Sequence, residues 1–184
     1  VGVVGDLDYL LQSRANRDPQ AIFAEELDSC AALKERLAGA RQLFPMKVTK
    51  DFSYRADRVA GDGWVLVGDA FGFLDPVYSS GVLLALKSGE LAADTIGGAL
   101  SDGDLSAARL GSFGPEFTRG MEAVRKLVYA FYTKEFSFAD FLKAHPECKQ
   151  GIVDILSGNI YDDSVQAIFE PMGRMCPLPE DLTL

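Results

Sequence analysis

The sequence predicts an α/β protein, arranged within these residues as an α+β chain: a few strands followed by a mostly helical C-terminal region. Between residues 46 and 67, short apolar or alternating runs are separated by turn residues, which is the pattern of strands. From residue 82 onward, apolar side chains recur every three or four residues, as on one face of a helix. Of the 184 residues, 48% are hydrophobic, which is enough to bury a core.

The first 38 residues predict the end of a strand followed by a helix. Val1 to Val4 is a short apolar run typical of a strand end. Asp18 before Pro19 is a helix N-cap followed by proline at the first helical position. Apolar residues then recur at helical spacing from Phe23 to Leu37, so residues 19 to 38 are predicted to form an amphipathic helix.

Two strands are predicted next. Residues 46 to 58 mix β-branched and aromatic side chains, including Val48, Phe52 and Tyr54, with polar ones. Gly61-Asp62-Gly63 is a turn signal. Trp64 to Val67 has no polar alternation, so we expect a returning strand that is buried on both faces.

The rest of the chain is predicted to be helical. A helix is expected from residue 82 to about 97, ended by Gly97-Gly98, and a short helix after the loop 101–104. Pro115 opens a longer helix. Its predicted core-facing stripe consists of Phe117, Met121, Val124, Val128 and Phe131. Short helices and loops follow, and the aromatic cluster of Phe131, Tyr132, Phe136, Phe138 and Phe141 is expected to pack in the core rather than to line a pocket.

Composition excludes several classes of partner. The 27 acidic and 18 basic side chains give a net charge of −9, which disfavours binding to nucleic acids and anionic membranes. The longest apolar runs fall far short of the roughly 20 residues that cross a bilayer. The three cysteines form no C-x-x-C pair, so we expect reduced thiols, a cytoplasmic location and no metal site. His145, the one histidine, is expected at a helix end or on the surface.

The segment "GDAFGFLDPVYSSGV", residues 68 to 82, carries the strongest functional signal. Asp69 follows the apolar strand directly, so its carboxylate is predicted to lie exposed at the strand end and to accept hydroxyl hydrogen bonds. The serines at 79 and 80, with Gly81, stand at the start of a helix, where free backbone N–H groups attract negative charge. The alternative is that Ser79 or Ser80 merely caps the helix.

The order of strand, Gly-Asp-Ala, Asp-Pro loop, Ser-Ser-Gly and small-residue helix resembles the second flavin-binding motif of FAD-dependent monooxygenases, reductases and halogenases with the p-hydroxybenzoate hydroxylase-like fold. Within that superfamily, the sequence of residues 68 to 82 is most similar to that of flavin-dependent halogenases. "KDFSYRADRVAGDGWVLVGDA" extends the similarity upstream. The resemblance covers residues 47 to 97 well and the flanking helices loosely.

The resemblance implies FAD as cofactor. The residues that it places at the cofactor are Gly68, Asp69, Pro76, Ser79, Ser80, Gly81 and Val82. Asp69 is expected to bind the ribityl chain, and the loop from Pro76 to Gly81 to pass beside the isoalloxazine ring. The amides of Gly81 and Val82 are expected to face the N1–C2=O edge of that ring. In halogenase relatives, backbone amides at the positions that correspond to Ser80 and Gly81 also hold the halide, so chloride or bromide is an expected co-substrate.

Other family features do not occur in these residues. The dinucleotide fingerprint G-x-G-x-x-G is absent, and the halogenase hallmark with two tryptophans cannot be present because Trp64 is the only tryptophan. The catalytic residues, including a lysine, are therefore expected in a missing N-terminal half. We expect the isolated chain to bind FAD weakly or not at all. A flavin reductase or NAD(P)H is the expected electron source.

On this interpretation the chain has three segments. Residues 1–58 hold the end of a substrate-side sheet plus the amphipathic helix, residues 59–100 the C-terminal part of the FAD-binding domain, and residues 101–184 the helical C-terminal region. Halogenation and hydroxylation of an aromatic or carrier-bound substrate both remain open. So do a geranylgeranyl-reductase-like flavin reductase and a non-catalytic domain that has lost flavin.

Overall fold

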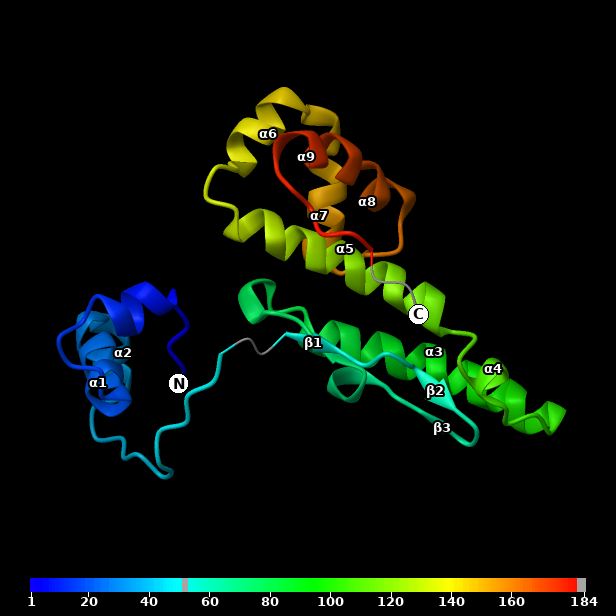
Figure 1. Cartoon of the computed structure of the whole chain (residues 1–184), viewed down its shortest axis with the longest axis horizontal. Helices are drawn as coiled ribbons and strands as arrows, with labels where there is room; N and C mark the ends of the chain where they lie inside the picture. Colours follow the sequence, from blue (N-terminus) through cyan, green and yellow to red (C-terminus); the bar gives the residue numbers. More distant parts are fainter. Residues whose placement is uncertain (51–52, 182–184) are drawn as a thin grey trace. The chain divides into compact units, whose positions relative to one another are not determined.

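The computed structural model describes residues 1–50 and 53–181. The chain divides into two compact units, Val1–Asp51 and Phe52–Leu184. Helices make up most of the described residues and the strands are few and short (Figure 1), which confirms the predicted secondary-structure content. The three-segment division by function remains a prediction.

The first unit contains a π-helical turn, Asp8–Gln12, and the helices α1 (Pro19–Ser29) and α2 (Ala31–Arg36). The predicted N-cap is confirmed, because the Asp18 carboxylate accepts a hydrogen bond from the Ala21 N–H at 3.0 Å. The single helix predicted for residues 19 to 38 is wrong. Its ladder breaks at Cys30, whose backbone is extended, and the preceding Ser29 hydroxyl donates to the Glu26 carbonyl at 2.8 Å. Residues 1 to 4 form no strand.

Two antiparallel strand pairs open the second unit. Strand β1 (Tyr54–Arg55) pairs with β4 (Gly72–Phe73), and β2 (Ala60–Gly61) pairs with β3 (Trp64–Val65) around a two-residue turn. Gly63 in that turn has a φ of +78°, which suits glycine and confirms the turn signal.

Both strand predictions were too long. Of residues 46 to 58 only Tyr54–Arg55 is a strand, and the predicted Phe52 lies outside the described residues. Trp64 is 45% exposed and Val67 is 37% exposed, so the run from 64 to 67 is not buried on both faces. The physical reason is that β3 belongs to a two-stranded pair, which has too few neighbours to cover both sides.

Helix α3 (Gly81–Asp102) is longer than predicted. It continues through Gly97-Gly98 and ends at Gly103, whose φ of +70° terminates the helix in the left-handed region. At Gly98 the Arg109 guanidinium lies against the helix, where it would meet an added Cβ.

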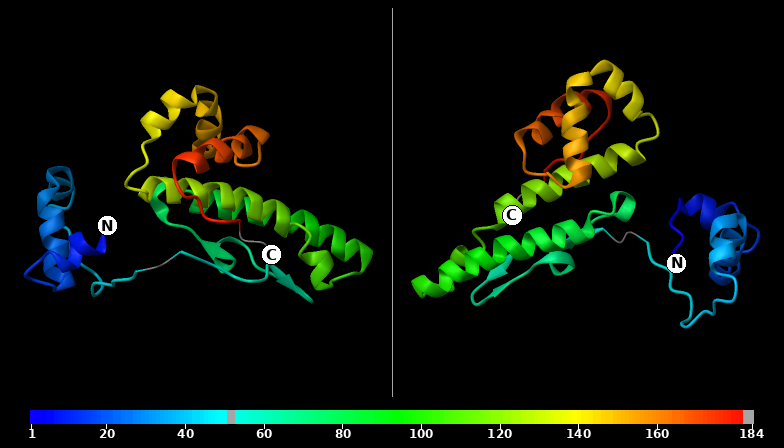
Figure 2. Two further views of the ribbon diagram at one scale, coloured as in Figure 1. Left: turned by 45° about the horizontal axis from the view of Figure 1, so that its top comes forward. Right: turned by 180° about the vertical axis from the view of Figure 1, so that it is seen from behind.

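Helix α5 (Gly114–Tyr132) lies between α3 and the C-terminal helices (Figure 2). Before it stands the short α4 (Ala107–Leu110), as predicted. After it come α6 (Phe138–Ala144), a 3-10 turn (Pro146–Cys148), α7 (Lys149–Ser157), α8 (Asp163–Ala167) and α9 (Phe169–Met175). The predicted opening at Pro115 and the series of short helices are confirmed. His145 ends α6, as expected.

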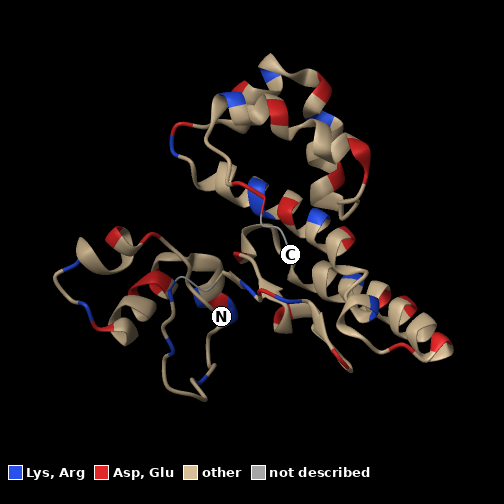
Figure 3. Cartoon of the chain, turned by 45° about the vertical axis from the view of Figure 1, so that its right-hand side comes forward, with Lys and Arg blue, Asp and Glu red and all other residues tan. Residues whose placement is uncertain are grey.

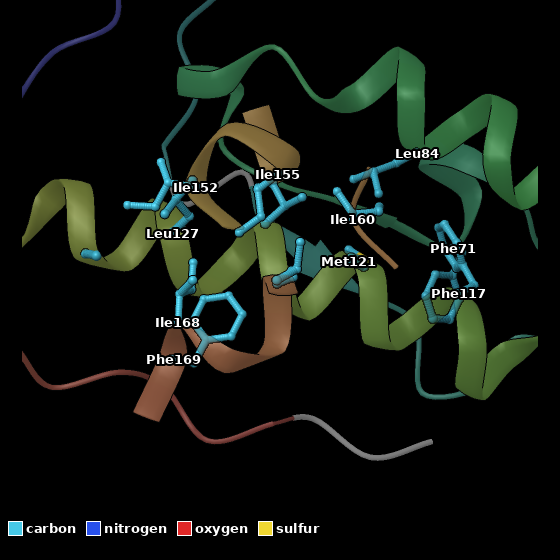
Figure 4. Close-up of a cluster of buried hydrophobic side chains, with 14 of the residues drawn as sticks. Phe71, Leu84, Phe117, Met121, Leu127, Ile152, Ile155, Ile160, Ile168 and Phe169 are labelled. Atoms are coloured by element: carbon cyan, nitrogen blue, oxygen red, sulfur yellow. The ribbon is translucent and has the colours of Figure 1, made fainter. Parts of the chain in front are cut away.

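The core lies along α5. Phe117, Met121 and Val124 are almost fully buried, and Figure 4 shows Phe117 beside Phe71 at one end of the cluster. The last member of the predicted stripe is wrong, since Phe131 is 50% exposed. The predicted aromatic cluster is divided, with Phe141 buried but Tyr132 exposed.

Charged side chains lie mostly outside this core. Acidic and basic residues are interspersed along the helices rather than gathered into one face (Figure 3). Among the described residues, no helix is both long enough and apolar enough to span a membrane.

Candidate functional site

The segment from residue 68 to 82 leaves β3 and returns to the start of α3. Gly68 begins a short 3-10 turn, Gly68–Ala70, with a φ of +53°. A Cβ added at Gly68 would lie 3.2 Å from the Cβ of Ala85 on α3. Glycine is therefore favoured both by its backbone conformation and by the close approach to the helix. Asp69 follows at an exposed position, as the sequence predicted.

One hydrogen bond from each side holds this turn. The supporting residues, Ser88 and Tyr54, were not identified from the sequence. The Gly68 N–H donates to the Ser88 hydroxyl at 2.8 Å, and that hydroxyl donates to the Ala85 carbonyl at 3.0 Å. On the other side, the Tyr54 hydroxyl donates to the Asp69 carbonyl at 2.6 Å. Ser88 is fully buried, and the only sequence signal for it was a serine on the otherwise apolar face of a helix.

The Asp69 carboxylate takes part in neither bond. Within residues 1–50 and 53–181 it has no hydrogen-bond or ion-pair partner. Its backbone is fixed while its two oxygens face solvent, so it can accept hydrogen bonds from hydroxyl groups of a ligand.

The next stretch, Asp75 to Ser80, is tied to α5 at two points. The Asp75 carboxylate accepts from the Val77 N–H and from the Tyr132 hydroxyl, both at 3.0 Å. The Tyr78 hydroxyl donates to the Leu127 carbonyl at 3.4 Å. Burial raises the pKa of Tyr78 to about 12, so this hydroxyl stays protonated at neutral pH.

The start of α3 is open. Ser79 has a φ of +54°, an unusual conformation for a residue other than glycine, and Ser80 is the N-cap without a side-chain hydrogen bond to the helix. Within the described residues, the Ser80 hydroxyl therefore does not cap the helix. Nothing lies within 4 Å of a Cβ built on Gly81, and Val82 is 73% exposed. The first amides of a helix have no acceptor within the helix, and such groups favour an anion or electron-rich oxygen.

Both parts of the motif use α3 as a common support. The Gly68 turn contacts the helix at Ser88, and the loop joins it at Gly81, seven residues earlier. At a rise of about 1.5 Å per residue, these points are roughly 10 Å apart along the helix. This is a suitable span for a ligand with a polyol chain at one end and an electron-rich ring edge at the other, and the exposed carboxylate and free amides match those two groups. The chemistry of these groups is compatible with the flavin part of FAD.

A cavity of about 160 Å³ adjoins the loop. Its lining comes from Tyr78, Ser79, Ser80, Leu83, Val124 and the α7 end from Ile155 to Gly158. No pattern in the sequence indicated that α7 would reach this place. Among the described residues, no cluster of side chains is arranged to hold a metal ion.

Comparison with known protein families identifies the chain. A family model described as tryptophan halogenase matches residues 20–145, a range that includes the whole segment 68–82. The chain belongs to the tryptophan halogenase family. This membership places it in the flavin-dependent halogenase superfamily that its motif resembled.

Individual members of this halogenase family show the same relationship. The chain is 28% identical over 153 residues to a 1H-pyrrole-2-carbonyl-[peptidyl-carrier protein] chlorinase of Pseudomonas fluorescens, covering 83% of this chain and 34% of the chlorinase. It is 30% identical over 162 residues to the corresponding brominase of Pseudoalteromonas luteoviolacea, covering 88% of this chain and 39% of the brominase.

A solved structure agrees with this halogenase assignment. The flavin-dependent brominase Bmp2 superposes with a TM-score of 0.66 and 25% identity, covering 91% of this chain and 42% of the brominase. The chain therefore spans well under half the length of the halogenases that it matches.

Proposed function

We propose that this chain is the C-terminal portion of a flavin-dependent halogenase with the p-hydroxybenzoate hydroxylase-like fold. The whole protein would halogenate an aromatic substrate, either a small molecule or a carrier-bound group. The observation that carries the proposal is that the turn with the exposed Asp69 is bonded to the same helix, α3, that begins with an exposed Gly81, in a chain of the tryptophan halogenase family.

Each site residue has a proposed task. Asp69 accepts hydrogen bonds from the ribityl hydroxyls, while Gly68 lets the turn approach α3. The loop from Pro76 to Gly81 would pass beside the isoalloxazine ring, and the amides of Gly81 and Val82 would stabilise negative charge at its N1–C2=O edge. The amides of Ser80 and Gly81 hold chloride or bromide near the same place.

The cofactor supplies the redox chemistry when it is bound. In the overall reaction one ring C–H bond is replaced by a carbon–halogen bond and its proton is released. Reduced FAD would supply two electrons and the halide would supply two more, and these four electrons with four protons would convert molecular oxygen into two water molecules. A flavin reductase or NAD(P)H would restore the reduced cofactor.

The adenosine diphosphate half of FAD would bind elsewhere in the whole protein. The relatives are much longer than this chain, and G-x-G-x-x-G does not occur in its sequence. We therefore propose that a missing N-terminal half completes the site, supplies the catalytic lysine, and is required for tight FAD binding. Stoichiometric, tight binding of FAD to the present 184 residues alone would contradict this part of the proposal.

Replacing Asp69 tests the cofactor contact. In the full-length protein, Asp69→Ala should weaken FAD binding about 10- to 100-fold, because a charge-assisted hydrogen bond contributes about 1.5–3 kcal/mol. Flavin absorbance of the purified protein and equilibrium titration with FAD measure the change. Asp94→Ala, which removes another exposed carboxylate from the same region, is the matched control and should bind FAD normally. Equal FAD affinity of the Asp69 variant and wild type would refute the contact.

Halide dependence tests the reaction. With a flavin reductase present, the full-length protein should form brominated product only when bromide is added. Hydroxylated product that forms equally without halide would establish a monooxygenase instead. Retained fold with no bound flavin would indicate a non-catalytic domain.

A further inference from the structure

One side of helix α3 is apolar and exposed. Leu86 is 70% exposed and Leu100 is 63% exposed. Between them Gly89, Ala93 and Gly97 continue the same line at spacings of three or four residues, and nothing lies within 4 Å of a Cβ built on either glycine. At a rise of about 1.5 Å per residue, the line is about 21 Å long. We call these five residues the open face of α3.

The other sides of α3 have different surroundings. Its buried side consists of Leu84, Ser88, Ala92 and Ala99. Its charged side chains follow a separate row, in which Lys87 and Glu90 are paired at 2.8 Å and Asp94 comes next. The open face is therefore a second apolar side of the helix. A helix that is apolar on more than one side is typically covered on each of them, and an exposed apolar surface of this kind marks a contact with another segment or protein.

The open face adjoins the turn that carries Asp69. A Cβ added at Gly68, in that turn, would lie 3.2 Å from the Cβ of Ala85 on α3. Ala85 and Gly89 are four residues apart, so they are neighbours on the surface of the helix. A segment that covers the open face would therefore lie next to the proposed contact between Asp69 and the ribityl chain.

The size of the open face favours a segment of the same protein over a second copy. A length of about 21 Å and a helix width of about 10 Å give roughly 200 Å². A stable complex of separate molecules buries about 800 Å² on each partner. A segment of the same protein does not need so large an area, because its covalent connection gives it a high effective concentration at the surface.

The relatives show how much further chain such a protein has. The matches cover 34% of the chlorinase and 39% of the brominase, so well over half of each relative lies outside the match. Under the proposed function, the missing N-terminal half binds the adenosine diphosphate part of FAD, while Asp69 binds the ribityl chain. One FAD molecule has to reach both, so the missing half has to come close to the Asp69 turn and hence to the open face.

We propose that the open face of α3 is the docking surface for the N-terminal half of the same protein, which lays an apolar segment between Leu86 and Leu100. This inference rests on the proposed function, which requires that half. Docking brings the part that binds adenosine diphosphate next to the Asp69 turn. The small residues in the middle of the open face leave room for larger apolar side chains of the docked segment.

Photo-cross-linking identifies the occupant directly. The photoreactive amino acid p-benzoylphenylalanine is placed at position 100, in place of Leu100, in the full-length protein. After irradiation, mass spectrometry should find this position linked to a peptide that precedes Val1. The same group at position 94, in place of the exposed Asp94 in the charged row, is the control and should give far fewer of these links.

A charge on the open face tests the consequence for the cofactor. Ala93 is exposed in the described residues, so Ala93→Asp should not disturb their packing. In the full-length protein it should weaken FAD binding about tenfold or more, because docking would bury an unpaired charge. Ser101→Asp adds the same charge at an exposed position of α3 outside the open face, and it should bind FAD as wild type does.

The cross-linked product separates the possible occupants. A link to residues 1–50, a covalent dimer, or no link at all would each overturn the proposal. Equal FAD affinity of the Ala93 and Ser101 variants would also overturn it. Bromide-dependent product formation is measured on the same full-length protein. Its absence in wild type would overturn the proposed function, and the cross-link would still decide whether the N-terminal half lies on the open face.

Discussion

Ser88 supports the candidate site from a fully buried position. Its hydroxyl is the acceptor for the Gly68 N–H, at a turn where a positive φ favours glycine. Ser88→Ala leaves that amide without an acceptor, and we expect it to lower the free energy of unfolding by about 1–3 kcal/mol. Chemical denaturation measures the change.

Ser101 offers a matched comparison on the same helix. Its hydroxyl also donates to a carbonyl one turn earlier, that of Gly97 at 3.0 Å, but it is exposed and holds no turn. Ser101→Ala should change stability by less than about 0.5 kcal/mol. If both serine variants lowered the free energy of unfolding equally, the hydrogen bond to Gly68 would not be what makes Ser88 important.

The residues that could be predicted at this site are those that stand together in the chain. Asp69 and the serine-glycine helix start fall within fifteen positions, and strand-end and helix-start chemistry is local. Their supports are distant: Ser88 is 20 residues from Gly68, Tyr54 is 15 from Asp69, and Tyr132 is 57 from Asp75. Such contacts follow from tertiary packing, which no spacing rule describes.

At the level of secondary structure, helices were predicted better than strands. A helix such as α5 satisfies its own backbone, so its apolar period and opening proline are sufficient signals. The strands here depend on partners, and β1 reaches only as far as its pairing with β4. An apolar run such as residues 64 to 67 indicates a strand, but it does not indicate which elements cover the two faces of that strand.

The length of α3 gives a prediction for this element. Gly97 lies inside the helix with open space around it, so Gly97→Ala should raise the free energy of unfolding by about 0.5–1 kcal/mol. Gly103→Ala should lower it by about 1–2 kcal/mol, because the helix ends there with a φ of +70°. Thermal or urea denaturation distinguishes the two. Destabilisation by Gly97→Ala would show that the helix ends at the first glycine pair after all.

At the scale of the molecule, the candidate site depends on three helices from separate parts of the sequence. Helix α3 provides the exposed start at Gly81 and the support for Gly68, α5 anchors the loop through Tyr132, and the end of α7 contributes to the lining of the cavity. The family match ends at residue 145, before α7 begins. The part of the cavity lining that comes from α7 therefore lies outside the residues that the family model matches.

Two partly buried tyrosines make the stability of the protein depend on alkaline pH. Burial raises the pKa of Tyr78 to about 12 and also raises the pKa of Tyr161, since the folded protein disfavours the phenolate. An unfolded tyrosine titrates near pH 10. The stability from these groups is therefore complete below about pH 10 and is lost as pH rises through the folded pKa values.

Two tyrosine variants separate this alkaline effect from ordinary packing. The Tyr161 hydroxyl is buried with no hydrogen-bond partner among the described residues, so Tyr161→Phe should be neutral or slightly stabilising at pH 7. Tyr78→Phe should be slightly destabilising there, because it removes the bond to Leu127. Both variants should lose less stability than wild type between about pH 10 and pH 12, measured by urea denaturation at each pH. A wild-type unfolding free energy that stayed constant across this range would contradict the prediction, because neutral, buried tyrosines then could not be contributing to folding.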